Sequence, residues 1–269
     1  MGAKTAAAPE LLAEQKEGVL LLTLNRPEVL NSLTGAMLSG LSESLKKAAK
    51  DPGVRSVILT AKGRAFCAGA DLADLRARQK GTGVSLGDEL RRHFNPLILQ
   101  IRRLEKPVIG AVNGLAAGAG ASLILSCDIK IAAPHSRFIL AFGQVGLVPD
   151  SGMTYDLPRR MGLSLALEYA WTGRPITADR ALEFGLVNRV AASEEETLAL
   201  AWDMARQLAA KAPLAVGMAK RAMNRAFDND LEAQLEYEAE LQETLGKTKD
   251  HAEGVAAFLE KRKPAFKGE

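Results

Sequence analysis

The chain has 269 residues, of which 47% are hydrophobic and 25% charged. This is the composition of an ordinary soluble globular protein with one α/β domain, alone or with a helical appendage. The 35 basic and 32 acidic side chains leave a formal charge of only +3, and 5% of the residues are aromatic, so we expect no nucleic-acid partner. Residues 1–10 lack the apolar stretch of a signal peptide, and no window offers about eighteen uncharged apolar residues, so we expect a cytoplasmic protein without a membrane partner.

The cysteines and histidines show no metal-binding pattern. Cys67 and Cys127, with His93, His135 and His251, form none of the CxxC, HxxxH or HExxH spacings. We therefore predict no metal site. A cysteine nucleophile is an alternative, but free cysteines are usually small buried hydrophobic residues, and we assign them no chemistry.

Apolar runs bounded by turn residues predict alternating strands and helices in the first two thirds of the chain. An amphipathic helix is expected to begin at Thr34 and to end before residues 51–53. Strands separated by helices imply parallel strands with right-handed crossovers, and therefore a mixed α/β fold. The other expected elements are strands at Gly18–Leu24, Val54–Thr60, Pro107–Val112, Asp128–Ala133 and Leu186–Val190, and short helices at Gly162–Trp171 and Thr177–Phe184.

Beyond Ser193 the pattern is helical only, and Asp250 and Glu253 stand at the spacing of a capping box. Such a block needs an apolar surface to cover, on its own sheet domain or on a neighbouring subunit, and we expect oligomerisation. We divide the chain into a flexible N-terminus (1–15), a core (16–192) and a C-terminal helical region (193–269). The helices expected in that region are Glu196–Lys211, Leu214–Phe227, Leu231–Leu245 and His251–Lys261.

Two glycine-rich turns are the chemically informative segments: Phe66–Leu72 (FCAGADL) and Val112–Gly120 (VNGLAAGAG). Each follows a predicted strand, and small residues let the backbone approach a ligand closely. The second turn is expected to open a helix at Ala121–Ser126, whose free amides favour an anion or a developing oxyanion. A P-loop needs Gly-Lys-Ser/Thr, and a dinucleotide fingerprint needs a small residue at Leu123, so neither pattern fits. Tight packing of strand against helix is the alternative use of these glycines.

Several motifs together resemble the crotonase (enoyl-CoA hydratase/isomerase) superfamily. They are Phe66–Leu72, Lys106–Gly114 (KPVIGAVNG), Cys127–Ile129, Gly146–Asp150 (GLVPD), Thr172–Gly173 and Ala181–Val187 (ALEFGLV). The resemblance runs from about Gly18 to the C-terminus, and so many motifs in the right order are hard to obtain by chance. It implies an α/β spiral of ββα units with a C-terminal helical trimerisation region, in a homotrimer or a hexamer made as a dimer of trimers. It also implies an acyl-CoA substrate, with coenzyme A as part of that substrate and no separate cofactor.

The same resemblance implies two backbone N–H groups that hold the thioester oxygen, on Ala70 and Ala119. Donors placed for the enolate lower the barrier to its formation, and removing one typically costs about a hundred- to a thousandfold in rate. For Lys261, and for Lys263 beside it, a position near the phosphates is implied, and an ordinary solvated C-terminus is the alternative. Coenzyme A is expected along Val29, Ala68, Ala70, Asp71, Leu72, Leu115 and Gly118.

The sequence departs from the hydratases of this superfamily at two positions. The resemblance places their two catalytic glutamates at Ser122 and Phe142, and neither residue can exchange a proton with water as a carboxylate does. Asp150 remains, at the position where isomerases and 4-chlorobenzoyl-CoA dehalogenases of the superfamily carry a catalytic aspartate. In an apolar acyl pocket its pKa would rise, which suits a proton shuttle. The alternative is a turn or helix N-cap residue after Pro149.

The branch that the chain resembles most is that of the 2-(1,2-epoxy-1,2-dihydrophenyl)acetyl-CoA isomerases and related Δ3,Δ2-enoyl-CoA isomerases. We predict that Asp150 takes a proton from the carbon alpha to the thioester and returns it further along the chain. Alternatives are a hydratase with one acid, a dehalogenase in which Asp150 attacks carbon, and a catalytically silent acyl-CoA-binding protein. The dehalogenase is disfavoured because no aryl-cradling motif is present and His93 cannot be placed as its base. The resemblance to this branch is carried by Ala141–Phe142, Gly146–Gly152, Leu157–Arg159 and Asp250–Phe258.

Overall fold

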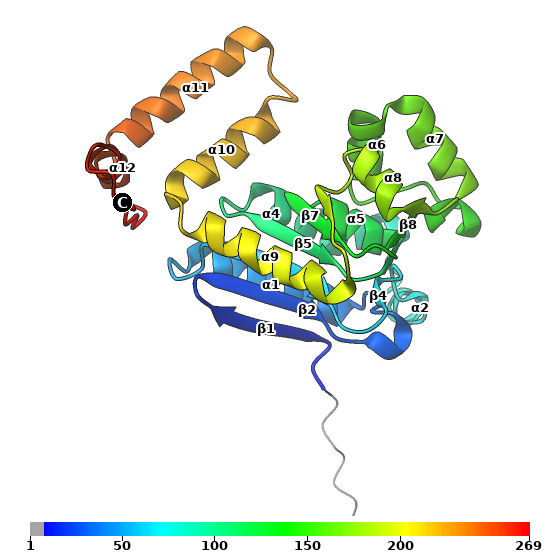
Figure 1. Ribbon diagram of the computed structural model, residues 1–269. Coiled ribbons are helices and arrows are strands. Elements are labelled where there is room, and N and C mark those ends of the chain that lie inside the picture. Colours follow the sequence, from blue (N-terminus) through cyan, green and yellow to red (C-terminus); the bar gives the residue numbers. More distant parts are fainter. Residues whose placement is uncertain (1–7) are drawn as a thin grey trace, which may run out of the picture.

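A computed structural model of the protein describes residues 8–269. Two sheets form its centre, one of six strands in the order β1-β2-β3-β5-β7-β10 and one of four in the order β4-β6-β8-β9 (Figure 1). The strands are β1 (Leu11–Lys16), β2 (Val19–Leu24), β3 (Ser56–Ala61), β4 (Ala65–Cys67), β5 (Val108–Val112), β6 (Leu115–Ala117), β7 (Ile129–Ala132), β8 (Arg137–Ile139), β9 (Ile176–Thr177) and β10 (Arg189–Val190).

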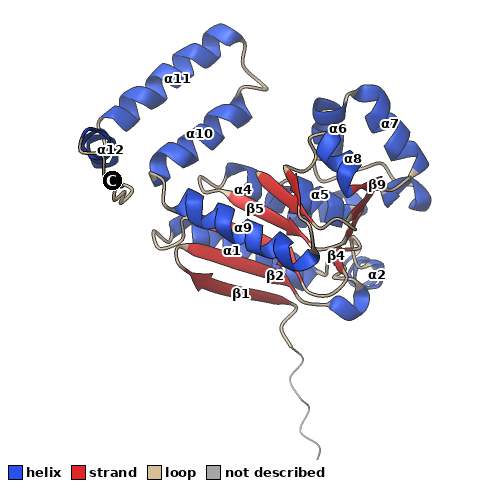
Figure 2. Cartoon of the chain, in the orientation of Figure 1, coloured by secondary structure: helices blue, strands red, loops and turns tan. Residues whose placement is uncertain are grey.

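Helices cover the sheets and continue beyond them at the C-terminal end (Figure 2). Up to the end of the core they are α1 (Gly35–Lys50), α2 (Leu72–Thr82), α3 (Leu86–Glu89), α4 (Asn95–Arg103), α5 (Ala119–Leu125), α6 (Met153–Met161), α7 (Leu163–Thr172) and α8 (Ala178–Glu183). The last four are α9 (Glu194–Ala209), α10 (Pro213–Arg225), α11 (Leu231–Gly246) and α12 (Lys249–Leu259). Three single turns are η1 (Pro27–Val29), η2 (Leu90–Phe94) and η3 (Ala141–Val145).

The strand pairing follows a repeated unit of two strands and a helix. In the larger sheet, β2, β3, β5, β7 and β10 pair in parallel, and only the edge strand β1 is antiparallel. Each of β3, β5 and β7 is followed by a short strand of the smaller sheet, β4, β6 or β8, and then by helical structure. This arrangement confirms the predicted α/β fold of ββα units.

The larger sheet is buried on both faces, and β3 shows why. All six of its residues are buried, as expected for a central parallel strand. Because side chains alternate along a strand, Val57 and Leu59 enter the main core with residues of α1, whereas Ile58 enters a second cluster. That second cluster contains Ala201 and Ala205 of α9, whose small side chains let the helix lie close to the sheet. The first C-terminal helix therefore covers its own sheet.

Most of the predicted elements are present, with ends that differ from the prediction by at most three residues. Threonine side chains cap two of these helices at their N-termini. Thr34 Oγ1 accepts a hydrogen bond from the Met37 amide at the start of α1, and Thr177 Oγ1 accepts one from the Arg180 amide at the start of α8. None of the helices in residues 8–269 has the length and apolar character needed to cross a membrane.

The predicted flexible N-terminus is wrong where it overlaps β1. Residues 11–16 pair with β2 in a register that joins Leu11 to Leu24 and Lys16 to Val19. The segment LLAEQK has no β-branched residue and its last four residues are exposed, so its own pattern is weak and the pairing with β2 determines its structure. Residues 1–7 of the predicted flexible segment lie outside the described residues.

The predicted capping box at Asp250 and Glu253 is also wrong. The N-cap of α12 is Thr248, whose Oγ1 accepts a hydrogen bond from the His251 amide. Asp250 lies inside the helix and is buried, and its carboxylate accepts hydrogen bonds from the amides of Lys267 (2.7 Å) and Gly268 (2.8 Å). The carboxylate thus holds the C-terminal tail, a use that spacing along the helix does not reveal.

Helices α10–α12 extend away from the sheets as an arm (Figure 1). Lys220 of α10 anchors its base, because its Nζ donates to Asp128 Oδ2 (2.7 Å) and to the carbonyl of Ile101 (2.7 Å). The Asp128 carboxylate also accepts a hydrogen bond from the Val108 amide at 2.8 Å. Burial raises the pKa of Asp128, although Lys220 opposes the rise. Lys220 therefore neutralises a partly buried carboxylate where the arm joins the core.

We expect Lys220→Met to lower the free energy of unfolding by about 2 kcal/mol, because it removes the cation that pairs with the partly buried carboxylate of Asp128. The variant should recover part of this loss in acid. A carboxylate whose pKa is raised by folding destabilises the fold as the pH rises through that value, and protonation relieves it. Urea denaturation at pH 5 and pH 8 measures both effects. The matched control is Lys247→Ala, which removes an exposed pair with Glu243 and should change stability by less than about 1 kcal/mol.

Candidate active site

A cavity of about 170 Å³ lies where the two glycine-rich turns meet α2, the α3–η2 segment and η3. Its lining brings together Ala70, Ala119 and Asp150, the three residues predicted to be catalytic. The remaining lining is backbone of the turns, an apolar wall and one further carboxylate. These residues are Ala68, Gly69 and Gly118, then Leu72, Leu75, Leu86, Leu90, Phe94, Ala141, Phe142, Val145 and Leu147, and finally Glu89.

The two turns lie against each other with almost no space between their backbones. Gly69 has a φ of 108°, and a Cβ on it would lie 3.2 Å from the carbonyl oxygen of Ala117 and 3.7 Å from the amide nitrogen of Ala119. A Cβ on Gly120 would lie 2.5 Å from the carbonyl oxygen of Cys67. The glycines therefore permit tight packing, and the same packing puts the turns at one cavity.

Neighbouring amides in the turns donate hydrogen bonds to backbone carbonyls, whereas those of Ala70 and Ala119 do not. The amide of Asp71 donates to the carbonyl of Leu33 (2.9 Å), and that of Gly118 donates to the carbonyl of Ile139 (3.0 Å). Within residues 8–269, the N–H groups of Ala70 and Ala119 find no acceptor. Two unused backbone donors on one cavity are what an oxyanion needs.

Asp150 reaches the cavity from the turn that leads into α6. Its Oδ1 accepts a hydrogen bond from the hydroxyl of Ser151 (2.9 Å), and burial raises the pKa of the carboxyl above its usual range. Asp150 is not the helix cap that its position after proline suggests, because the N-cap of α6 is Gly152. Ser151 and Gly152 have positive φ values of 52° and 87°. A serine in the left-handed region is uncommon and strained, and such strain is often found at functional sites.

The two positions implied for hydratase glutamates carry other functions here. Ser122 is buried in α5, and its hydroxyl donates to the backbone carbonyl of Asp150 at 3.0 Å. Phe142 is buried in η3 and forms part of the apolar cavity wall. Ser122 thus helps to fix the turn at Asp150. Phe142 puts an apolar ring where a hydratase would have a carboxylate to orient water.

Glu89 is the site residue that the sequence analysis missed. It is buried in α3, lines the cavity, and accepts a hydrogen bond from Arg78 of α2 at 2.5 Å. One signal was available, since Leu86 and Leu90 stand four residues apart on a helical face with Glu89 beside them. Its pairing with Arg78 depends on how α2 and α3 pack, which the spacing of the residues does not show.

The residues predicted to line coenzyme A fall into two groups. Ala68, Ala70, Leu72 and Gly118 line the cavity, whereas Val29, Asp71, Leu115 and Lys261 do not.

The Asp71 carboxylate is engaged within the fold. It accepts hydrogen bonds from the amides of Asp74 and Ala73 (both 3.1 Å) and pairs with Arg26 at 2.9 Å. The Asp74 amide and Arg26 hold the pKa of Asp71 below its usual range. Lys261 is exposed and follows the end of α12, and α12 lies on the opposite side of the molecule from α2 (Figure 1). In a single chain, Lys261 is therefore remote from the cavity.

The cysteines and histidines do not contribute to this cavity. Cys67 and Cys127 are buried, and burial raises the pKa of each thiol to about 12, so neither is a thiolate nucleophile near neutral pH. His93 lies in η2 but does not line the cavity. In the part of the chain that the structure describes, no group of three or more His, Cys, Asp or Glu residues could hold a metal ion.

Comparison with known proteins identifies the family. The sequence pattern of the Enoyl-CoA hydratase/isomerase family matches residues 14–269. The chain is 44% identical to the 1,2-epoxyphenylacetyl-CoA isomerase of Escherichia coli (strain K12), covering 96% of this chain and 98% of that one. It is 39% identical to the 2,3-dehydroadipyl-CoA hydratase of the same organism, covering 96% and 99%. A crystal structure of an enoyl-CoA hydratase from Polaromonas sp. JS666 superposes with a TM-score of 0.88 at 37% identity, covering 95% and 99%. The chain belongs to the enoyl-CoA hydratase/isomerase (crotonase) family.

Proposed function

We propose that this chain is an acyl-CoA isomerase that moves a double bond, or rearranges a ring epoxide, through a thioester enolate. The observation that carries the proposal is the lining of one apolar cavity by two unused backbone amides, Ala70 and Ala119, and by the half-buried carboxylate of Asp150. The similarity to an isomerase over 96% of the chain supports it. Hydratases are also among the relatives, so the chemistry has to be argued from the site.

In the proposed reaction, the thioester oxygen accepts hydrogen bonds from the amides of Ala70 and Ala119. The Asp150 carboxylate removes a proton from the carbon alpha to the thioester, and the negative charge moves onto the oxygen, where the two donors stabilise it. The protonated Asp150 then returns the proton further along the chain. A single carboxylate completes this cycle, and a raised pKa helps it both to take and to return the proton.

We expect Asp150→Asn to lower kcat for double-bond migration by about a hundred- to ten-thousandfold, because an amide cannot accept the proton. Assays of 3-enoyl-CoA and 2-enoyl-CoA substrates by absorbance and mass follow migration and hydration separately. Retention of migration by the variant would mean that another group is the base.

The pH dependence of kcat/KM gives an independent check on Asp150. Proton removal needs the ionised carboxylate, so the rate should fall in acid, with a midpoint above the ordinary aspartate value of about 4. In Ser151→Ala the midpoint should move to higher pH, because the lost hydrogen bond stabilises the ionised form. A midpoint unmoved by Ser151→Ala would argue against Asp150 as the titrating group.

We expect Ala119→Pro to reduce kcat by about a hundred- to a thousandfold while leaving the melting temperature nearly unchanged. Ala119 is the first residue of α5, where proline fits a helix, and proline has no amide proton to donate. The matched control is Leu163→Pro, at the first residue of α7 and also after a glycine N-cap. It removes an amide proton outside the cavity and should leave kcat unchanged.

Hydration is a second candidate, because Glu89 gives the cavity another carboxylate. A hydratase would need Glu89 and Asp150 to act on one water molecule, as two carboxylates do in general acid and base catalysis. The Arg78 guanidinium is bound to Glu89, which favours a role as hydrogen-bond acceptor over proton donor. Hydration that depends on both Glu89 and Asp150 would favour this second reading.

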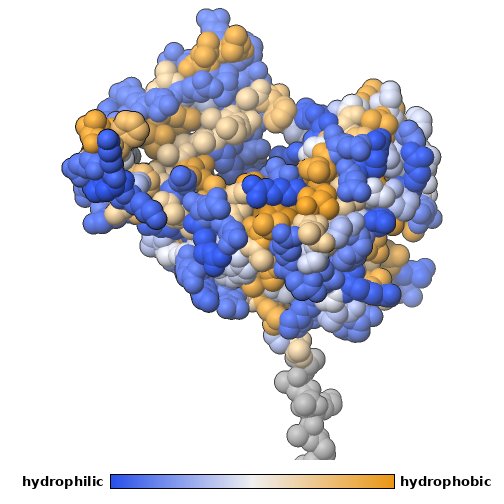
Figure 3. Space-filling model, viewed as in Figure 1, coloured by the Kyte–Doolittle hydropathy of each residue, from blue (hydrophilic) through white to orange (hydrophobic). Residues whose placement is uncertain are grey.

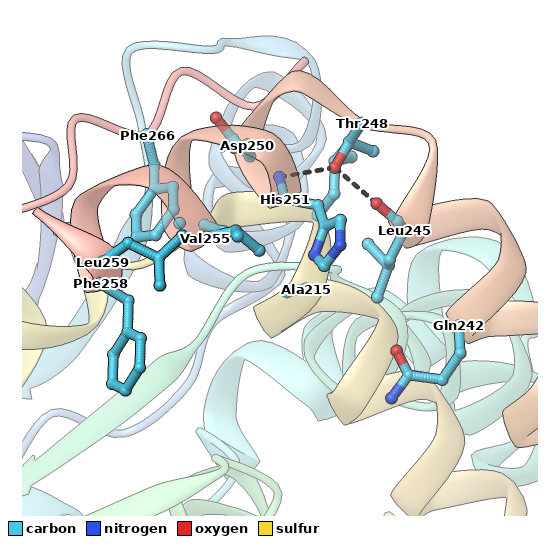
Figure 4. Close-up of a pocket in the computed structure, with 13 residues that line it drawn as sticks. Ala215, Gln242, Leu245, Thr248, Asp250, His251, Val255, Phe258, Leu259 and Phe266 are labelled. Atoms are coloured by element: carbon cyan, nitrogen blue, oxygen red, sulfur yellow. Dashed lines mark hydrogen bonds between the residues drawn. The ribbon is translucent and has the colours of Figure 1, made fainter.

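We also propose that α10–α12 form an interface between copies of the chain. Met223, Phe227, Leu231, Leu235, Val255, Phe258 and Leu259, here called the C-terminal apolar face, are all exposed. Phe258 is 84% exposed and stands at the mouth of a pocket of about 410 Å³ between α10, α11 and α12 (Figure 4). In Figure 3, apolar side chains gather along the arm beside the hollow between arm and core. Exposed apolar surface of this extent is typical of a protein interface. A homotrimer, or a dimer of trimers, would cover it and would let Lys261 approach the coenzyme A of a neighbouring copy.

We expect the protein to sediment as a multiple of the 28.7 kDa chain, with three or six copies, and Phe258→Glu to shift it toward one copy. The reason is that a buried, unpaired charge at an interface strongly opposes association. Analytical ultracentrifugation over a range of concentrations measures the mass. Lys249→Glu alters charge on the same helix outside the C-terminal apolar face and should keep the assembly. A wild-type protein that sediments as one copy would contradict the proposal.

A further inference from the structure

Glu89 places a charged side chain in a wall that is otherwise apolar. The residue is 4% exposed, and the cavity residues next to it on α3 and η2 are Leu86, Leu90 and Phe94. A buried carboxylate is costly unless its oxygens are paired or hydrogen-bonded. The contacts of its two oxygens therefore show what this charge does in the wall.

Among the described residues, one of the two oxygens has a hydrogen-bond partner. Oε2 accepts a hydrogen bond from Arg78 NH1 at 2.5 Å, and Arg78 Nε also donates to Asp74 Oδ2 at 2.9 Å. Asp74 Oδ2 in turn accepts a hydrogen bond from the amide of Gly35 at 3.0 Å. The chain of contacts fixes the Glu89 carboxylate between α2 and α3. Among residues 8–269, Oε1 receives no donor.

We propose that Oε1 of Glu89 accepts a hydrogen bond from a hydroxyl group carried by the acyl part of the substrate. Glu89 would then select hydroxylated acyl-CoA thioesters over their unsubstituted analogues. A carboxylate held by a guanidinium offers lone pairs and no proton, so its ligand must be a donor. A site built to bind a hydroxyl discriminates strongly against the analogue that lacks it, because the buried acceptor is then left unpaired.

The size of the cavity fits a small acyl group. Its volume is about 170 Å³, and an apolar cavity of about 150 Å³ in another protein holds benzene. A single ring or a short chain on the thioester can therefore occupy the space between the two turns and Glu89. The proposal rests on the site described under the proposed function, but it concerns binding and not the proton transfer.

Non-reactive thioesters separate this inference from the isomerase proposal. Phenylacetyl-CoA and its 2-, 3- and 4-hydroxy derivatives carry no double bond that can migrate, and calorimetry measures their affinities without turnover. Wild-type protein should bind at least one hydroxy derivative about tenfold more tightly than phenylacetyl-CoA. This preference would persist even if Asp150 proved not to be the base. Equal affinity for all four thioesters in the wild type would overturn the proposal without any variant.

The variant Glu89→Met removes the acceptor and keeps a side chain of similar length, and Arg78 retains Asp74 as a partner. We expect the tenfold preference to fall to about onefold, with the affinity for phenylacetyl-CoA unchanged or higher. The control Asp88→Asn alters the neighbouring exposed carboxylate and should keep the preference. Weaker binding of all four thioesters by the same factor would show that Glu89 only braces α2 against α3, and would overturn the proposal. If Glu89→Met fails to fold, Glu89→Gln gives the same comparison with a neutral, weaker acceptor.

Discussion

The close contact between two backbone turns is the constraint on which the site depends. A Cβ on Gly120 would overlap the carbonyl oxygen of Cys67, and a Cβ on Gly69, where φ is 108°, would be crowded by the carbonyl oxygen of Ala117 at 3.2 Å. A side chain at either glycine would move the turns apart and would separate the amides of Ala70 and Ala119. Both donors are backbone N–H groups, so the positions of the two turns determine whether they can bind one oxyanion.

The parallel sheets explain how two segments far apart in the sequence reach this contact. Strands β3 and β5 pair in parallel, and so do β4 and β6. Chains that leave parallel neighbouring strands emerge at the same edge, where α/β proteins commonly place their ligands. The turns after β4 and β6 therefore meet each other, and the helices α2 and α5 begin there.

Local patterns were enough to predict the strands and helices that bury a continuous apolar face, such as Val54–Thr60, and the glycine turns that follow them. They failed for β1, because its own sequence has a weak strand pattern and its conformation depends on pairing with β2. They also failed for Glu89, whose importance comes from an ion pair with Arg78 across two helices and from the cavity beside it. Asp150 could be placed because a resemblance marked its position, while the hydrogen bond from Ser122 to its carbonyl needed the folded chain.

Asp150 and Glu89 are two carboxylates on one cavity, and their surroundings suit them to different tasks. Within the described part of the chain, the Asp150 carboxylate accepts one hydrogen bond, from the Ser151 hydroxyl, and pairs with no cation. Burial therefore raises its pKa, which suits it to proton exchange. Glu89 is bound to the Arg78 guanidinium, which suits it to accept a hydrogen bond and not to move a proton. Two acids in different environments on one cavity can serve separate purposes, one in catalysis and the other in substrate recognition. In this proposal, Glu89 binds a polar acyl group and does not act as a second base. The cavity then favours isomerisation through an enolate over the addition of water, which needs two carboxylates.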